Sequence, residues 1–586
     1  MTQPFAPVFV PPQERPSQAA ALHASRWLLA GSALALAACS STPLPAWNSN
    51  VAPMAPAVQH SVPVQPTTQA LPTPDITPIA PSTTLQALPY SAAIADLFPA
   101  PSERYSTPGL ADGRRSFTTN AELTAALRDL AQKNTTGNVR LGVLDAGNAQ
   151  SGTPLLALVA TSGKAITPLA LDETRRPTVL IVAGQQGNAP ASTEAVLALA
   201  QELGQDGLLA PLLEQLNIIL VPRANPDGFD QGVAHTANGT DLRVDHLQLK
   251  TPEARFLAKL ARDYRATVVI DAGEFAAIEP TLQRYAAVRA NDVGLQYAVT
   301  PNANEFVTKA AREWLYQPTA NALKQADLVI DWSSSPVGNN ADAGFAMGTI
   351  EPTTLSNVSS LKNAASLEIQ SRGTDLDRTH LQRRVHSHVK ALTAALQSVA
   401  HRANDLRQVQ TFVTRDVASQ ACRGTTAIQS LPRAEQRNLT LIDAGSAQRV
   451  EKSVAWSSSL STTPSRTRQQ ACGYWLSANA VQATELLSMQ GVNVQRVAEL
   501  ASLQADSYQL QAGAISTGAP IVSLNSTTLQ ASPGSYYISM NQPLAYLAAA
   551  ALEPDTNYSY LHTGILRELT DVARVTALPN IVFEEE

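Results

Sequence analysis

Three uninterrupted apolar runs, separated by stretches of helical periodicity, constrain the fold of this chain more than any other feature. The runs cover Pro177–Gly184, Asn217–Pro222 and Ala266–Asp271. A strand that is apolar on both faces is typical of a sheet covered by helices on both sides. Helical stretches lie between the runs, at Glu194–Leu203 and Thr251–Tyr264. The alternation predicts an α/β fold with parallel strands, whose functional loops lie at the carboxyl ends of the strands.

The sequence pattern changes near residue 405. The chain has 586 residues, which is more than one typical domain. Beyond residue 405, short runs of alternating polar and apolar residues predict strands separated by turns. These runs are Val409–Thr414, Leu439–Asp443, Gly473–Ser477, Ser507–Leu510 and Ser535–Ser539, interrupted by helix-like pieces at Ala480–Gln490 and Leu544–Leu552. We therefore expect an α/β domain over residues 105–405 and a mostly β domain over residues 406–586.

The first 38 residues have the pattern of an export signal. Arg26 precedes the apolar run Trp27–Ala38, which is too short to cross a hydrocarbon core about 30 Å thick but suits a signal peptide. Leu36–Cys39 resembles the lipobox of bacterial lipoproteins, in which the cysteine is acylated and becomes the new amino terminus. The resemblance implies a signal peptide over residues 1–38 and a membrane anchor through a lipid on Cys39. An ordinary secretory signal is the alternative.

By the same resemblance, Ser40 favours the outer membrane, so we expect a lipid-anchored protein on its periplasmic face.

Residues 39–104 are rich in Pro, Ala, Ser and Thr and carry little charge. Such a composition cannot bury enough apolar surface to fold, which predicts an extended tether. The net charge of −6 shows no excess of basic residues, so we do not expect nucleic acid as a partner.

The remaining two cysteines are Cys422 and Cys472, both in the region beyond residue 405. In an oxidising compartment we expect a disulfide between them, and closing a loop of this length contributes roughly 3–4 kcal/mol. Two unpaired buried thiols are the alternative.

Five ordered segments between residues 105 and 405 resemble the signature segments of carboxypeptidase A-type zinc metallopeptidases. The segments are Gly184–Pro190, Val221–Gly228, Thr240–His246, Val269–Phe275 and Asn363–Gly373. The resemblance implies a carboxypeptidase-like mixed sheet sandwiched between helices. It also implies a hydrolytic site with three zinc ligands, a zinc-bound water, a glutamate as general base and arginines that hold the substrate carboxylate.

The residues that carry this chemistry in the family are replaced here. Gln186, Ala189 and Gly273 stand at the positions of the three zinc ligands, His, Glu and His. Alanine and glycine have no donor atom in their side chains, and a neutral amide is a weak zinc ligand. Gln370 stands at the general-base position, where an amide has no useful basicity. We therefore expect neither bound zinc nor another cofactor.

The substrate-binding positions are replaced as well. Arg243 and Val244 stand where the family has an Asn-Arg pair, and Ala234 stands, in a looser alignment, where it has a further arginine. A displaced base remains an alternative: Glu368 lies two residues before Gln370, so on a strand both would face the same side about 6–7 Å apart. A carboxylate paired with Arg372 or Lys362 is the simpler interpretation of Glu368.

Two hypotheses follow for the function. The first is a non-catalytic lipoprotein that binds a peptide, a peptidoglycan fragment or a protein partner through the old cleft. The second is an active hydrolase with a relocated site that uses Glu368, Glu274, Asp271 or a nearby histidine such as His246, with zinc if a metal is involved.

Overall fold

The computed structural model describes residues 88–135, 137–338, 344–511 and 520–585. From residue 88 onward these belong to one compact unit. The predicted signal peptide, Cys39 and most of the predicted tether lie outside the described residues. In the part of the chain that the structure covers, no helix is both long enough and apolar enough to cross a membrane.

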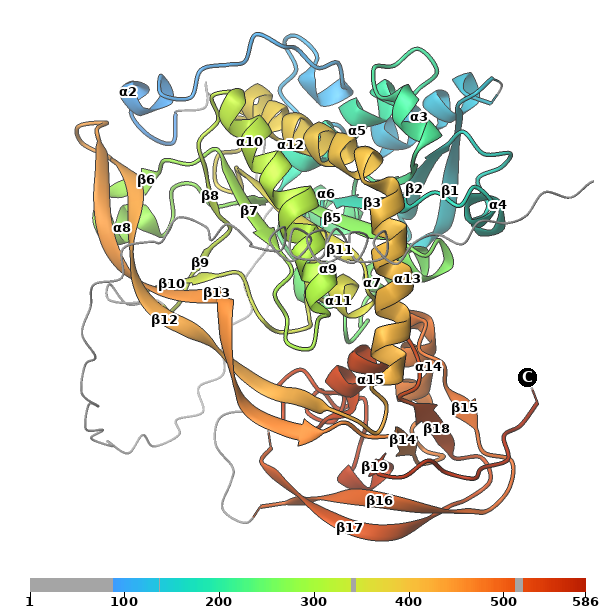
Figure 1. Cartoon of the computed structure of the whole chain (residues 1–586). Helices are drawn as coiled ribbons and strands as arrows, with labels where there is room; N and C mark the ends of the chain where they lie inside the picture. Colours follow the sequence, from blue (N-terminus) through green and yellow to red (C-terminus); the bar gives the residue numbers. More distant parts are fainter. Residues whose placement is uncertain (1–87, 136, 339–343, 512–519, 586) are drawn as a thin grey trace, which may run out of the picture. The chain divides into compact units, whose positions relative to one another are not determined.

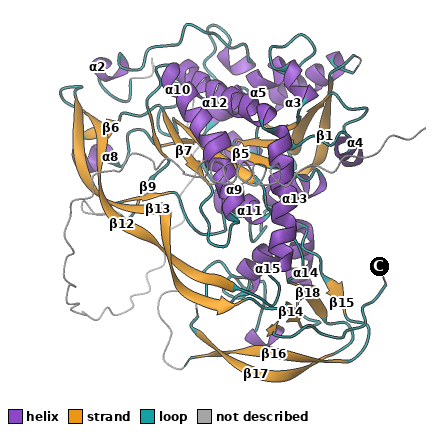
Figure 2. Cartoon of the chain, in the orientation of Figure 1, coloured by secondary structure: helices purple, strands orange, loops and turns teal. Residues whose placement is uncertain are grey.

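A large mixed sheet forms the centre of the amino-terminal half of the described chain (Figures 1 and 2). In spatial order its strands are β1 (Arg140–Asn148), β2 (Pro154–Thr161), β4 (Asn217–Val221), β3 (Thr178–Ala183), β5 (Val268–Phe275), β11 (Ala365–Arg372), β7 (Val293–Tyr297) and β8 (Ile330–Trp332). The central strands β4, β3, β5 and β11 are parallel, whereas β1, β2 and β7 introduce antiparallel pairs. The predicted mixed α/β sheet is confirmed.

Helices cover both faces of this sheet because its central strands are apolar on both sides. Val179 and Ile181 of β3 point into one core, and Leu180 and Val182 point into the other. The first core is closed by α3 (Asn120–Lys133), α5 (Pro190–Glu202), α10 (Gln317–Gln325) and α12 (Leu381–His401). The second is closed by α7 (Pro252–Asp263) and α11 (Leu355–Leu361).

Local signals set where several helices begin. Thr119 and Glu122 form a reciprocal capping box at the start of α3, and Pro190 occupies the first turn of α5. The shorter helices of this half are α2 (Ala92–Ala95), α4 (Pro168–Glu173), α6 (Pro226–Gln231), α8 (Thr281–Tyr285) and α9 (Glu305–Ala310).

The carboxyl-terminal region is rich in sheet, as predicted. A five-stranded sheet joins β12 (Thr425–Asp443) and β13 (Arg449–Gln469) of this region to three short strands from earlier in the chain, β6 (Ala287–Arg289), β10 (Phe345–Met347) and β9 (Ser335–Pro336). A six-stranded sheet contains β15 (Gln495–Arg496), β18 (Tyr536–Ser539), β14 (Gly473–Leu476), β19 (Val572–Val575), β16 (Ala501–Leu510) and β17 (Val522–Ala531). Both predicted helical pieces of this region are helices, α14 (Val481–Gln490) and α15 (Ala545–Leu552).

One predicted strand of this region is wrong. Val409–Thr414 lies inside α13 (Ala403–Ser419), a helix that the alternation concealed. The buried residues Leu406, Val413 and Val417, with Val409 half-buried between them, repeat at helical spacing. The predicted domain boundary at residue 405 falls within this helix. Cys422, just beyond α13, forms a disulfide with Cys472, whose S–S distance is 2.00 Å.

Candidate functional site

The replaced positions gather at the carboxyl ends of β3, β5 and β11. Gln186 and Ala189 lie in the loop between β3 and α5. The parallel register of β5 and β11 places Asp271 beside Glu368 and Gly273 beside Gln370. Because residues two apart on a strand share a face, these four residues form one patch on one side of the sheet. The structure therefore brings Gly273 and Gln370 together, while Gln186 and Ala189 follow the neighbouring strand β3.

Zinc does not fit the residues at the three ligand positions. Ala189 is 1% exposed and caps α5, and its backbone N–H donates to the carbonyl of Gln186 at 3.1 Å. Gly273 and Ala189 offer no donor atoms from their side chains. Within the described ranges, no group of three His, Cys, Asp or Glu side chains converges in a way that could hold a metal ion.

Gly273 has no structural requirement for glycine. A Cβ atom built at this position meets only Cγ of Gln370, at 3.9 Å, which is ordinary van der Waals contact. Its backbone is also not left-handed, so any L-residue can adopt it. The position has room for a side chain toward Gln370.

Asp271 and Glu368 are two neighbouring carboxylates on the floor of this site. Burial and the neighbouring Glu368 raise the pKa of Asp271 to about 7. Burial also raises the pKa of Glu368, while a hydrogen bond from Ser333 Oγ to Glu368 Oε1 (2.7 Å) and the charge of Arg243 oppose that shift. Two such carboxylates can share a proton or attract a cation.

Neither Arg372 nor Lys362 is the partner of Glu368, contrary to the sequence interpretation. The guanidinium carbon of Arg372 lies 3.3 Å from the centre of the Phe98 ring. Lys362 follows α11, and burial lowers its pKa to about 7. Glu368 instead interacts with Ser333, Gln370 and Arg243. Ser333 comes from the loop after β8 and had no recognisable signal in the sequence.

The positions where the resemblance implies substrate-binding arginines hold one cation. Arg243 forms an ion pair with Asp241 (Nη2–Oδ2, 2.7 Å) and contributes to the electrostatics of Asp271 and Glu368. Val244 is 44% exposed. Ala234 contributes only a backbone carbonyl, which accepts from Asn225 Nδ2 at 3.2 Å.

Two residues of the relocated-site hypothesis have structural partners instead. His246 Nε2 lies 2.6 Å from Oε1 of Gln185, and burial lowers its pKa to about 3, so its ring is neutral. Glu274 points to the opposite face of β5 from Asp271. There it accepts hydrogen bonds from Arg384 Nη2 (2.5 Å) and from the backbone N–H of Ala191 (2.6 Å).

The raised pKa of Asp271 predicts a pH-dependent stability. Below about pH 4 the carboxyl group is protonated in both the folded and the unfolded chain, and its contribution to the free energy of unfolding is fully favourable. As the pH rises toward 7 the unfolded chain ionises first, so folding loses stability through this window. We expect Asp271→Asn to reduce the fall in melting temperature between about pH 5 and pH 8 by several degrees. Thermal melts at both pH values measure this, with the exposed Asp263→Asn as control. An equal fall in wild type and Asp271→Asn would contradict the assignment.

Known carboxypeptidases are similar to this chain. A zinc carboxypeptidase family model matches residues 125–371. Carboxypeptidase 2 of Trichophyton rubrum is 22% identical over 503 residues, which cover 81% of this chain and 91% of that protein. Carboxypeptidase D of Mus musculus is 30% identical over 120 residues, which cover 18% of this chain and 9% of that protein. The crystal structure of the carboxypeptidase A from Helicoverpa armigera superposes with a TM-score of 0.38 and 15% identity, over 52% of this chain and 78% of that chain.

Proposed function

We propose that this chain uses the fold of the carboxypeptidase A-type zinc carboxypeptidases without their catalysis. The premise is that the domain containing residues 125–371 belongs to this family. In this proposal the old cleft binds a peptide, a peptidoglycan fragment or a protein partner. The lipid on Cys39 and the tether over residues 39–104 would hold the domain in the cell envelope, on the periplasmic side of the outer membrane.

The environment of Gly273 carries this proposal. A side chain at this position has space, and the backbone does not demand glycine. The missing ligand is therefore not explained by steric exclusion. Ala189 offers no donor atom and Gln370 offers no basic group at the positions where the resemblance implies the second ligand and the general base, and a metal site needs several correctly placed ligands at once.

Metal analysis of the purified chain tests the proposal. We expect well below one zinc per chain after dialysis in zinc-containing and then zinc-free buffer, and no release of carboxyl-terminal residues from peptides above the rate in buffer without the protein. One tightly held zinc per chain, lost in a His246→Ala variant, would show that a relocated metal site exists.

A second candidate function is a hydrolase whose acid–base group has moved to the carboxylate pair. The observation that favours it is the adjacency of Asp271 and Glu368, with the pKa of Asp271 raised to about 7, in the range useful for proton transfer. If this hypothesis holds, any peptide hydrolysis by the wild type falls by about 10²–10⁴-fold in Glu368→Gln. The same variant should leave the rate unchanged if the activity comes from a contaminant.

A further inference from the structure

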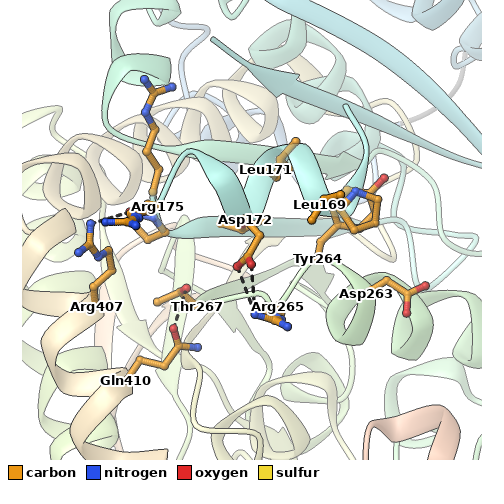
Figure 3. A pocket seen from close by; sticks show the side chains of 14 residues that line it. Leu169, Leu171, Asp172, Arg175, Asp263, Tyr264, Arg265, Thr267, Arg407 and Gln410 are labelled. Atoms are coloured by element: carbon orange, nitrogen blue, oxygen red, sulfur yellow. Dashed lines mark hydrogen bonds and ion pairs between the residues drawn. The ribbon is translucent and has the colours of Figure 1, made fainter. Parts of the chain in front are cut away.

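A cavity lies near the amino ends of β3 and β5, at the opposite ends of these strands from Gln186, Ala189 and Gly273. Its volume is about 600 Å³, and it is formed by α4, by the segments that lead into β3 and β5, and by α13. Figure 3 shows Arg175 and Arg407 at one end, Leu169 and Tyr264 at the other, and Asp172 between them. Gln186 and Ala189 follow the carboxyl end of β3, and Gly273 lies near the carboxyl end of β5, whereas this cavity adjoins the amino ends of both strands. It is therefore separate from the site described above.

The cavity lining has an excess of positive charge. It contains four arginines and two aspartates: Arg175, Arg176, Arg265, Arg407, Asp172 and Asp263. Both aspartates are already paired, Asp172 with Arg265 (3.2 Å) and Asp263 with Arg262 (2.7 Å). Among the described residues no carboxylate pairs with Arg175, Arg176 or Arg407. Three arginines without a carboxylate partner thus line one cavity, in a chain whose net charge is −6. Nη1 of Arg176 already donates to the carbonyl of Leu213 (2.7 Å) and to Ser162 Oγ, so Arg175 and Arg407 carry most of the charge available to a ligand.

The neighbouring polar groups leave mainly hydrogen-bond donors facing the cavity. Arg407 Nη1 donates to the carbonyl of Arg175 at 2.6 Å, which uses one of its donors and holds the side chain in place. Thr267 Oγ1 donates to Oε1 of Gln410 at 3.3 Å, so the acceptor of this amide is used and its NH₂ group remains. A lining of this kind complements a ligand that supplies acceptors and negative charge.

The backbone conformation of the segments that line the cavity does not explain why arginines stand there. Arg175 and Arg265 both have left-handed backbone conformations, with φ of 55° and 47°. Glycine adopts this conformation without a steric penalty, and arginine does not. The fold alone would favour glycine at both positions, and such departures are characteristic of functional sites.

We propose that this cavity binds an anionic ligand with at least two carboxylate or phosphate groups. Arginine is suited to either, because its planar donor fork matches both anions. Leu171 and the ring of Tyr264, which are 2% and 7% exposed, add an apolar floor beside the charges. A volume of this size is typical of small-ligand sites.

Isothermal titration of the full chain with pyrophosphate and, separately, with tetraglutamate tests the proposal and distinguishes the two anions. We expect at least one probe to bind at low salt and to weaken as NaCl is added. Binding should weaken at least tenfold in Arg175→Gly and in Arg407→Gln. Since glycine suits the backbone at residue 175, Arg175→Gly should melt at or above the wild-type temperature, and Arg407→Gln provides an independent test if it does not.

Arg496→Ala is the matched control, because Arg496 is an exposed arginine paired with Glu584 in a different part of the fold. It should bind the probes as the wild type does. The proposal is overturned if neither probe binds, if binding is unchanged in both cavity variants, or if Arg496→Ala weakens it equally.

Discussion

Replacing Gly373 by alanine is expected to lower the free energy of unfolding by about 3–5 kcal/mol, because the substitution breaks a buried ion pair. A Cβ atom at this position overlaps Oε2 of Glu274 and lies 2.7 Å from Nε and Nη2 of Arg384. These two side chains form an ion pair that is 0% exposed on both sides. The flexible end of Glu274 cannot move aside without leaving a buried guanidinium unpaired.

Gly273→Ala is the matched control for this prediction. Gly273 lies on β5, next to Glu274, but a Cβ atom there meets only an ordinary contact. We expect a change of about 0.5 kcal/mol or less, or a slight gain from the smaller entropy of the unfolded chain. Urea unfolding of the two variants and the wild type measures the difference. Similar losses for both glycines would contradict the view that Gly273 has space and that Gly373 does not.

Replacing Glu553 by alanine is expected to destabilise the carboxyl-terminal region by a similar amount, about 3–5 kcal/mol. Glu553, just after α15, is 2% exposed. Its carboxylate accepts from Arg468 of β13, from Arg574 Nε of β19 (2.9 Å), from Tyr474 Oη of β14 (2.7 Å) and from Tyr508 Oη of β16 (3.1 Å). Without it, the two arginines lose a shared partner in a buried site.

The exposed glutamate Glu584 provides the comparison for Glu553. It pairs with Arg496 at 2.9 Å, and both side chains are about half exposed. Surface pairs of this kind contribute about 0–1 kcal/mol, so Glu584→Ala should unfold at nearly the wild-type urea concentration. If Glu553→Ala also does so, the four-partner network does not stabilise the region.

Much of the α/β half could be predicted from sequence because its signals are local. The uninterrupted apolar runs became β3, β4 and β5, and the helical stretches predicted between them lie in α5 and α7. The failure at Val409–Thr414 has an equally local cause. Six residues are compatible with both periods, and only the contacts of Leu406 and Val417 on either side select the helix.

The sequence by itself determined which chemical groups stand at the positions where the resemblance implies zinc ligands and a general base. Side-chain identity alone settles that Ala189 and Gly273 have no donor atoms in their side chains and that Gln370 is not a base, in whatever fold they lie. The structure decided what surrounds those positions. The pairing of Asp271 with Glu368, the hydrogen bond from Ser333 and the gathering of Arg175 with Arg407 join segments far apart in the chain. Such contacts arise from strand register and helix packing, which depend on the whole core rather than on any local pattern.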